Sequence, residues 1–264
     1  MANYTAADVK RLREETGAPM MECKGALDEA NGDFEKAKEL LRIKGKAAAA
    51  KRADRSTSEG VVAIKAEGAN LGAVVVECET DFVARNEEFM TMCSEMADKV
   101  CAGTGDEATL KEMAEGAVAR MRENCQVTKT VRMTGPDSAV FYVHHDRKSG
   151  AIVTYTGEAD AEVVRKVAVH ATASRPKVVS KDQLSQDELD KEYEVELKRA
   201  LEEGKPQNIA ENMAKGRVNK EFIRDSVLLE QPFYADPAKT VSQYLAESAR
   251  GVTITGFTLL AVGG

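Results

Sequence analysis

The sequence predicts an α+β fold in which two similar subdomains follow a short helical region. The main observation is an internal repeat: the apolar run at residues 72–76 matches residues 150–154, which lie 78 positions later. The β-branched residues of both runs are typical of buried strands. In each copy another strand precedes the run, at 61–67 and 139–144, and a helical pattern follows it. Two repeated α+β core subdomains are therefore expected.

The N-terminal region, residues 1–45, reads as three short helices. Thr5 is the expected N-cap of the first helix, and Gly17 is its expected end. Pro19 opens the second helix, where its missing N–H costs nothing. Asp33 caps the third. A domain of this size is marginal alone, which suits a module that docks on a partner or on its own chain.

Methionines mark the start of the second predicted helix. Met20, Cys23, Leu27 and Ala30 fall on one face and are expected to line the core of the module. Met21 is adjacent to Met20, so both cannot point into that core. One of the two is therefore expected to stay exposed as a soft contact surface.

Residues 46–59 form a basic, alanine-rich segment without an apolar face. A solvated linker is the favoured interpretation. A nucleic-acid contact has less support, because no aromatic residues are interleaved with the charges.

The first core subdomain, residues 60–136, contains the most distinctive corner of the chain. Thr80, Asp81, Phe82 and Val83 lie between a buried strand and a helix that Asn86 is expected to cap. Phe82 at the tip has two interpretations. It could fold back as the lid of its own core, or it could be an apolar wedge that is presented to a partner.

The second copy helps to choose between these interpretations. At the repeat offset, the corner falls on residues 158–161, where no aromatic is present and Asp160 looks like an ordinary N-cap. The framework therefore does not require an aromatic at this corner. The repeat favours the wedge for Phe82.

The second core subdomain, residues 137–181 and 229–264, is interrupted by a highly charged insertion at 182–228. Apolar residues recur at helical spacing on both sides of a Gly-Lys-Pro stop at residues 204–206. The insertion is therefore predicted to be an antiparallel helical hairpin with a thin seam. The predicted seam residues are Leu189, Tyr193, Leu197 and Leu201 on the first helix and Ile209 and Met213 on the second.

Composition excludes several classes of protein. The 264 residues carry a formal net charge of −7, which argues against a general nucleic-acid binder because phosphate would be repelled. The five cysteines are odd in number and form no Cys-x-x-Cys pair, which indicates free buried thiols in a reducing compartment. No apolar stretch is long enough to span a membrane, and the start of the sequence has no signal-peptide pattern. A cytoplasmic protein is expected.

Signals for catalysis are weak. The chain has no phosphate-cradling glycine loop, no nucleophile elbow and no zinc-ligand spacing. His144 and His145 are adjacent, and in a strand they would point to opposite faces and could not hold one ion together. A polar cluster at the end of a hairpin is the favoured interpretation of the pair. His170 is expected to be a histidine at the edge of the core. We predict no catalytic residue, metal or cofactor, and a hydrolase using either of the paired histidines is disfavoured.

Several segments together resemble one family. Residues 80–86, Thr-Asp-Phe-Val-Ala-Arg-Asn, look like a signature of bacterial elongation factor Ts, and residues 12–27 are similar to its other signature. Tyr193 and the segments at 204–206, 209–211 and 231–233 follow in the family's order, so the resemblance covers nearly the whole chain.

The resemblance implies a guanine-nucleotide exchange factor of elongation factor Tu, without active-site chemistry of its own. It implies binding to the GDP-bound and the nucleotide-free partner. Asp81 and Phe82, with Thr80 and Val83, would push beside the helix that helps to hold Mg²⁺ and would dislodge the ion. The N-terminal helices look like the ubiquitin-associated type and the insertion like a coiled coil. The residues implied in further contacts are Arg13, Met20 and Met21 in the N-terminal module and, more loosely, His144 and His145.

Other expectations concern partners. No direct contact with nucleic acid or membrane is expected, and a homodimer or a 2:2 heterotetramer with the partner stays open. Longer family members continue into a C-terminal helix that also contacts the partner, and that contact is not assumed for the sequence up to Gly264. The alternative function is a non-catalytic adaptor in which the helical module binds a polypeptide or ubiquitin-like partner.

Overall fold

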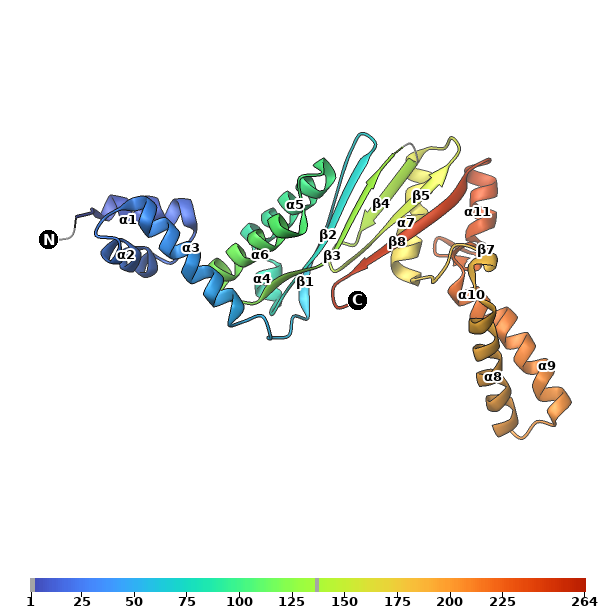
Figure 1. Cartoon of the computed structure of the whole chain (residues 1–264). Coiled ribbons are helices and arrows are strands. Elements are labelled where there is room, and N and C mark those ends of the chain that lie inside the picture. Colours follow the sequence, from blue (N-terminus) through green and yellow to red (C-terminus); the bar gives the residue numbers. More distant parts are fainter. Residues whose placement is uncertain (1–2, 136–137) are drawn as a thin grey trace. The chain divides into compact units, whose positions relative to one another are not determined.

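A computed structural model describes residues 3–135 and 138–264, which fall into two compact units (Figure 1). Unit 1 comprises residues 3–135, Asp146–Lys148 and Ala261–Gly264, and unit 2 comprises residues 138–145 and Ser149–Leu260. Both combine helices with antiparallel strand pairs, which confirms the predicted α+β class. The predicted boundary between the core subdomains, at 136 and 137, lies outside the described residues.

Unit 1 begins with three helices, α1 (Ala6–Thr16), α2 (Met20–Glu29) and α3 (Phe34–Ala50). The predicted caps form: Thr5 makes a capping box with Asp8, Gly17 ends α1 at a φ of 66°, and the Asp33 carboxylate accepts from the Lys36 N–H at 3.0 Å. Only a residue without a β-carbon adopts that positive φ at little cost. Helix α3 continues into the segment predicted as a linker.

The core of these three helices differs from the prediction at one residue. Cys23 and Leu27 are fully buried, as expected, but Met20 is 43% exposed and Met21 is 74% exposed. The prediction that Met20 lines the core was therefore wrong. Pro19 is the N-cap of α2, so Met20 belongs to the first turn of α2, and the buried α2 side chains are Cys23, Ala26 and Leu27.

The sheet of unit 1 has the strand order β1 (Glu59–Glu67), β2 (Asn70–Cys78), β3 (Cys125–Thr134), and its pairs are antiparallel. Helices α5 (Glu87–Ala102) and α6 (Glu107–Met121) lie along one side of it (Figure 1). The predicted stripe of α5, from Phe89 to Val100, is buried against the sheet. Gly72 permits this close packing, because a β-carbon there would lie 2.2 Å from the Cys101 nitrogen.

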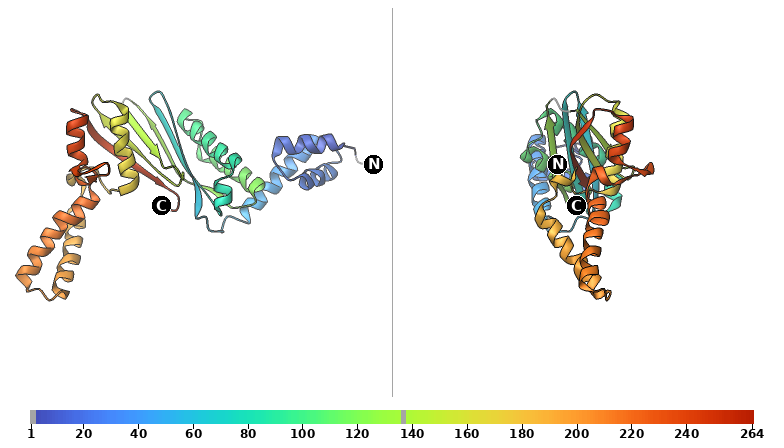
Figure 2. Two further views of the ribbon diagram at one scale, coloured as in Figure 1. Left: turned by 180° about the vertical axis from the view of Figure 1, so that it is seen from behind. Right: turned by 90° about the vertical axis from the view of Figure 1, so that its right-hand side faces the viewer.

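Unit 2 repeats the plan with the strand order β4 (Ser138–Val143), β5 (Ser149–Thr156), β8 (Thr253–Ala261). Helix α7 (Ala161–Ser174) covers one face of this sheet (Figure 2). The short strands β6 (Pro232–Phe233) and β7 (Asp236–Thr240) and helix α11 (Val241–Ser248) complete the core.

A helical hairpin extends from unit 2, with α8 (Gln186–Glu202) and α9 (Gln207–Arg217) side by side (Figure 2). A π-helical segment, Val218–Phe222, and α10 (Ile223–Ser226) lead the chain back, and 3₁₀ turns at Lys181–Gln183 and Leu228–Glu230 flank the insertion. The hairpin itself was predicted, but its seam was partly wrong.

Small residues form the buried seam of the hairpin: Ala200 on α8 faces inward, as do Ala210 and Ala214 on α9. Leu201 and Ile209, which were predicted for the seam, are 39% and 45% exposed. Glu196 is buried in this seam and pairs with Arg217 at 3.2 Å. Small side chains allow the two helices to approach closely. The other predicted seam residues are half-buried: Leu189, Tyr193, Leu197 and Met213.

Within the described residues, no helix has the length and apolar character that crossing a lipid bilayer would need.

Candidate functional site

The most conspicuous apolar side chain on unit 1 is Phe82, which is 83% exposed. It lies on α4 (Asp81–Ala84), a one-turn helix between β2 and α5. The next two residues, Val83 and Ala84, are buried in the core of unit 1. The core needs no contribution from the ring, so the interpretation of Phe82 as the lid of its own core was wrong.

Caps shape this corner, residues 79–86, which we call the Phe82 corner. Thr80 is the N-cap of α4, and its hydroxyl accepts from the Val83 N–H at 3.5 Å. Asn86 caps α5 as predicted, accepting from the Glu88 N–H at 2.8 Å. The sequence indicated a plain strand-to-helix corner, whereas residues 81–84 form a helical turn of their own.

Charge at the Phe82 corner is exposed. Asp81 pairs with Arg85 at 3.4 Å, one turn apart; the Arg85 side chain is largely in solvent, and the Asp81 side chain is partly exposed. Exposed pairs of this kind contribute little to stability.

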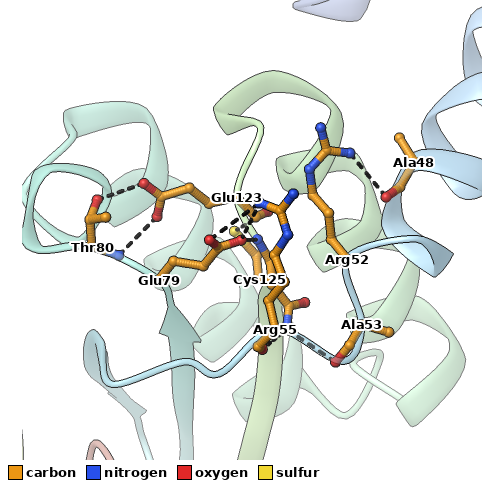
Figure 3. A network of polar contacts seen from close by, with 9 residues as sticks. Ala48, Arg52, Ala53, Arg55, Glu79, Thr80, Glu123 and Cys125 are labelled. Carbon is orange, nitrogen blue, oxygen red and sulfur yellow. Dashed lines mark hydrogen bonds and ion pairs between the residues drawn. The ribbon is translucent and has the colours of Figure 1, made fainter.

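A network of polar contacts joins Glu79 and Thr80 of the Phe82 corner to residues distant in sequence, among them Glu123 and Arg55 (Figure 3). The Glu123 carboxylate accepts from the Thr80 N–H at 2.9 Å and from the Thr80 hydroxyl at 2.6 Å. Glu79 accepts from the Asn124 N–H at 2.6 Å and from Arg55 at 3.3 Å. Glu123 and Asn124 were not predicted, because they lie more than forty positions from Thr80 and Glu79 in the sequence. The pairing register of β2 and β3 is the signal that could have found them.

The predicted contact residues of the N-terminal module are all exposed. Arg13 lies in the last turn of α1 and is exposed. Met20 and Met21 form an apolar pair at the start of α2. Flexible, polarisable methionines suit a contact surface.

His144 and His145 follow the end of β4, and their ring centroids are 4.2 Å apart. They lie in the turn that joins β4 to β5, so the favoured interpretation as a polar cluster at the end of a hairpin is confirmed. The strand ends at Val143, one residue before the predicted end at His144, so the argument from opposite faces of a strand does not apply. His144 Nδ1 forms a hydrogen bond with the Tyr142 hydroxyl at 3.0 Å, and His145 is exposed. The described residues contain no group of three or more histidine, cysteine or acidic side chains that could hold a metal ion.

His170 lies inside unit 2 and not at the edge of its core, which corrects the prediction. The side chain is 1% exposed, its Nε2 pairs with Gln231 Oε1 at 2.9 Å, and its Nδ1 accepts from the Tyr234 N–H at 3.3 Å. Burial disfavours the charged ring and lowers the pKa of His170, although the Gln231 contact acts in the opposite direction. The ring is a neutral structural group.

All five cysteines are buried and free, as predicted. Burial raises the pKa of the Cys78 and Cys125 thiols to about 12 in each case. Thiols of this kind are poor nucleophiles, because the thiolate is the reactive form. These thiols are therefore packing groups.

Comparison with known proteins shows what this chain is similar to. The family model described as elongation factor TS matches residues 79–264. Elongation factor Ts of Pasteurella multocida (strain Pm70) is 42% identical over 100% of this chain and 93% of the relative. The proteins of the same name from Nocardia farcinica (strain IFM 10152) and Hydrogenobaculum sp. (strain Y04AAS1) are 40% and 37% identical, over 100% and 98% of this chain and 99% and 98% of those relatives. These matches along the chain do not favour the adaptor alternative.

Proposed function

Because this chain belongs to the elongation factor Ts family, and is thus a translation elongation factor that promotes nucleotide exchange on elongation factor Tu, we propose that its Phe82 corner drives the release of GDP. The observation that carries the proposal is the exposure of the Phe82 ring on a helix turn whose neighbouring side chains fill the core. Because the ring is not buried in its own fold, the free energy of burying it becomes available when it binds a partner.

The magnitudes suit this role. A GDP held at nanomolar affinity is bound by roughly −12 kcal/mol. Burying one phenylalanine ring in a partner yields about 1.5–3 kcal/mol. The ring therefore accelerates release by weakening part of the nucleotide site, and it does not need to match the whole binding energy. Such coupling is reciprocal, so bound GDP weakens the factor as much as the factor weakens GDP.

The Mg²⁺ that accompanies the nucleotide is the part of that site we propose to be displaced. A bound divalent ion neutralises much of the charge of the phosphates, so its loss speeds their release. Phe82 would enter the partner beside the helix that helps to hold the ion, while Asp81 supplies charge next to it. Thr80 and Val83 hold the turn on which both residues sit.

Other exposed groups supply affinity in this proposal. Helices α1–α3 act as a ubiquitin-associated-like module whose Arg13, Met20 and Met21 hold another face of the partner. His144 and His145 make a smaller contact. The factor binds GDP-bound and nucleotide-free elongation factor Tu, contributes no active-site chemistry of its own and acts in the cytoplasm. The α8–α9 pair is a coiled-coil hairpin.

The test is the release of fluorescent GDP from elongation factor Tu, with wild-type chain and with Phe82→Ala. We expect stimulated release to fall by about ten- to a hundredfold, as the lost burial energy implies. The free energy of unfolding should change by less than about 1 kcal/mol, because the ring is exposed. The matched control is Val195→Ala, which removes a 56% exposed apolar side chain from α8. Undiminished release by folded Phe82→Ala protein would refute the proposal.

A further inference from the structure

Strands β2 and β3 end together at the pair Cys78↔Cys125. Beyond it the two chains separate, one toward α4 and the other from α6. If the same antiparallel register continued, Glu79 would face Asn124 and Thr80 would face Glu123. Buried backbone amides at such a divergence need acceptors from elsewhere, because the opposing carbonyls move out of reach.

Two carboxylates take the place of those carbonyls. The Asn124 N–H donates to Glu79 Oε1 at 2.6 Å, and the Thr80 N–H donates to Glu123 Oε2 at 2.9 Å. Each acceptor comes from the residue opposite in the continued register. A side chain reaches farther than a carbonyl, so the backbones can diverge while both amides stay bonded. Ionised acceptors also make these bonds stronger than neutral ones.

The Glu123 carboxylate also accepts a second hydrogen bond from Thr80. Its Oε1 accepts the Thr80 hydroxyl at 2.6 Å (Figure 3). With the hydroxyl hydrogen directed at Glu123, the oxygen lone pairs remain for the Val83 N–H at 3.5 Å. The carboxylate therefore orients the cap of α4. A helix of four residues depends on such support, because one turn is not stable alone.

The residues at which β2 and β3 diverge, Glu79, Thr80, Glu123 and Asn124, are called the joint below. Asn124 connects this joint to the segment that follows the N-terminal helices. Its side chain is 4% exposed, and its Nδ2 donates to the carbonyls of Ala53 at 3.3 Å and Arg55 at 2.8 Å. The joint thus holds three stretches of chain: the end of the linker, the start of α4 and the start of β3. A change at Glu123 loosens only the contact to α4.

We propose that Glu123 is a positioning residue for nucleotide exchange, which it supports by holding α4 and thereby aiming Phe82. This inference rests on the proposed function of Phe82. Glu123 acts through Thr80 and not through contact with the partner. If the turn frays, part of the energy of burying the ring is spent on ordering the turn, and less remains to displace the nucleotide.

The test combines two measurements on Glu123→Ala and on the milder, isosteric Glu123→Gln. Amide hydrogen exchange by NMR reports the order of α4 in the free chain, and release of fluorescent GDP from elongation factor Tu reports function. Release is measured with Phe82 present and in the Phe82→Ala background. The control is Glu95→Gln on α5, an exposed carboxylate without a hydrogen bond or ion pair to any residue of 3–135 or 138–264.

We expect Glu123→Ala to speed amide exchange at Thr80 and Val83 about tenfold, the size of one lost charge-assisted hydrogen bond. GDP release should fall about tenfold with Phe82 present and less than twofold in the Phe82→Ala background. Glu123→Gln, which keeps one acceptor oxygen, should lose less in both measurements, and it serves alone if the alanine variant does not fold.

Two results would overturn the inference. One is unchanged amide protection of α4 in the Glu123 variants. The other is an equal loss of GDP release in both backgrounds, because a residue that only stabilises the fold would act without regard to Phe82. If Phe82→Ala alone leaves release at the wild-type rate, the proposed function fails, and amide protection still decides whether Glu123 holds the turn.

Discussion

The two units share one plan but use the corner between the second strand and its helix for different purposes. In unit 2 that position is Asp160, whose carboxylate accepts from the Glu162 N–H at 3.0 Å and caps α7. In unit 1 it is Phe82, whose ring is in solvent and caps nothing. The cap has moved to Asn86, at the start of α5. A helix here needs a cap but no aromatic, so the aromatic is an addition that the fold does not explain.

The two units also differ in how the backbones next to the corner are connected. In unit 2 the position equivalent to Glu79 is Gly157, at a φ of 94°, where a β-carbon would lie 2.5 Å from the Gly251 carbonyl oxygen. The two backbones touch there, and no side chain fits between them. In unit 1 the carboxylates of Glu79 and Glu123 span the gap instead. In unit 2 the two backbones are therefore in direct contact at the corner. In unit 1 they are bridged by side chains, and the extra helical turn α4 follows.

The largest expected effect is on the free energy of unfolding, and it distinguishes two phenylalanines of unit 1. Phe89 is fully buried in the core, seven residues after the exposed Phe82. Phe89→Ala should lower the free energy of unfolding by about 3–5 kcal/mol, because it removes core contacts and leaves a cavity. Urea denaturation followed by circular dichroism measures this change. A loss below about 1 kcal/mol for Phe89→Ala would remove the contrast between the two rings.

A smaller effect concerns the cap in unit 2. Asp160→Ala should cost about 1 kcal/mol of stability, since the Glu162 N–H loses its acceptor at the start of α7. GDP release should stay at the wild-type rate, because the corner of unit 2 has no role in exchange. Asp160→Asn, which keeps the acceptor oxygen, is the matched control and should retain most of the stability. A release defect in folded Asp160→Ala protein would mean that the two corners share a function.

The smallest effect depends on pH and should be confined to unit 2. Burial lowers the pKa of His170, whereas the repeat places Met92 at the equivalent position of unit 1. The unfolded chain takes up a proton near the ordinary pKa of 6.5 that the folded ring resists. The contribution to stability is therefore complete above pH 6.5 and is lost as the pH falls below it. His170→Gln should flatten the pH dependence of urea denaturation between pH 7.5 and 5.5. An equally steep dependence in the variant would contradict this.

Much of the local structure was predictable because single residues determine it. Thr5, Gly17, Asp33, Asn86 and Asp160 each end or begin a helix through their own side chain or backbone, and all five were predicted correctly. The repeat likewise follows from one strand pattern seen twice. The domain boundaries and the contact residues stay predictions.

Two of the errors have a different cause, since they depend on what lies opposite in space. The hairpin seam was assigned to Leu201 and Ile209, but close helix packing selects Ala200 and Ala210. Glu123 was missed because its importance depends on the register of two strands that are distant in sequence. An alternating apolar pattern does not show where a carboxylate replaces a carbonyl.

The measurement that tests the central claim most directly compares the two corners on the same day and with the same partner. Stimulated release of fluorescent GDP from elongation factor Tu and the free energy of unfolding are measured for wild type, Phe82→Ala and Asp160→Ala. We predict a crossed result: Phe82→Ala loses release about ten- to a hundredfold with stability within about 1 kcal/mol, and Asp160→Ala loses about 1 kcal/mol with release intact. If release instead follows stability in both variants, the corner of unit 1 is no more specialised than that of unit 2, and the account is wrong.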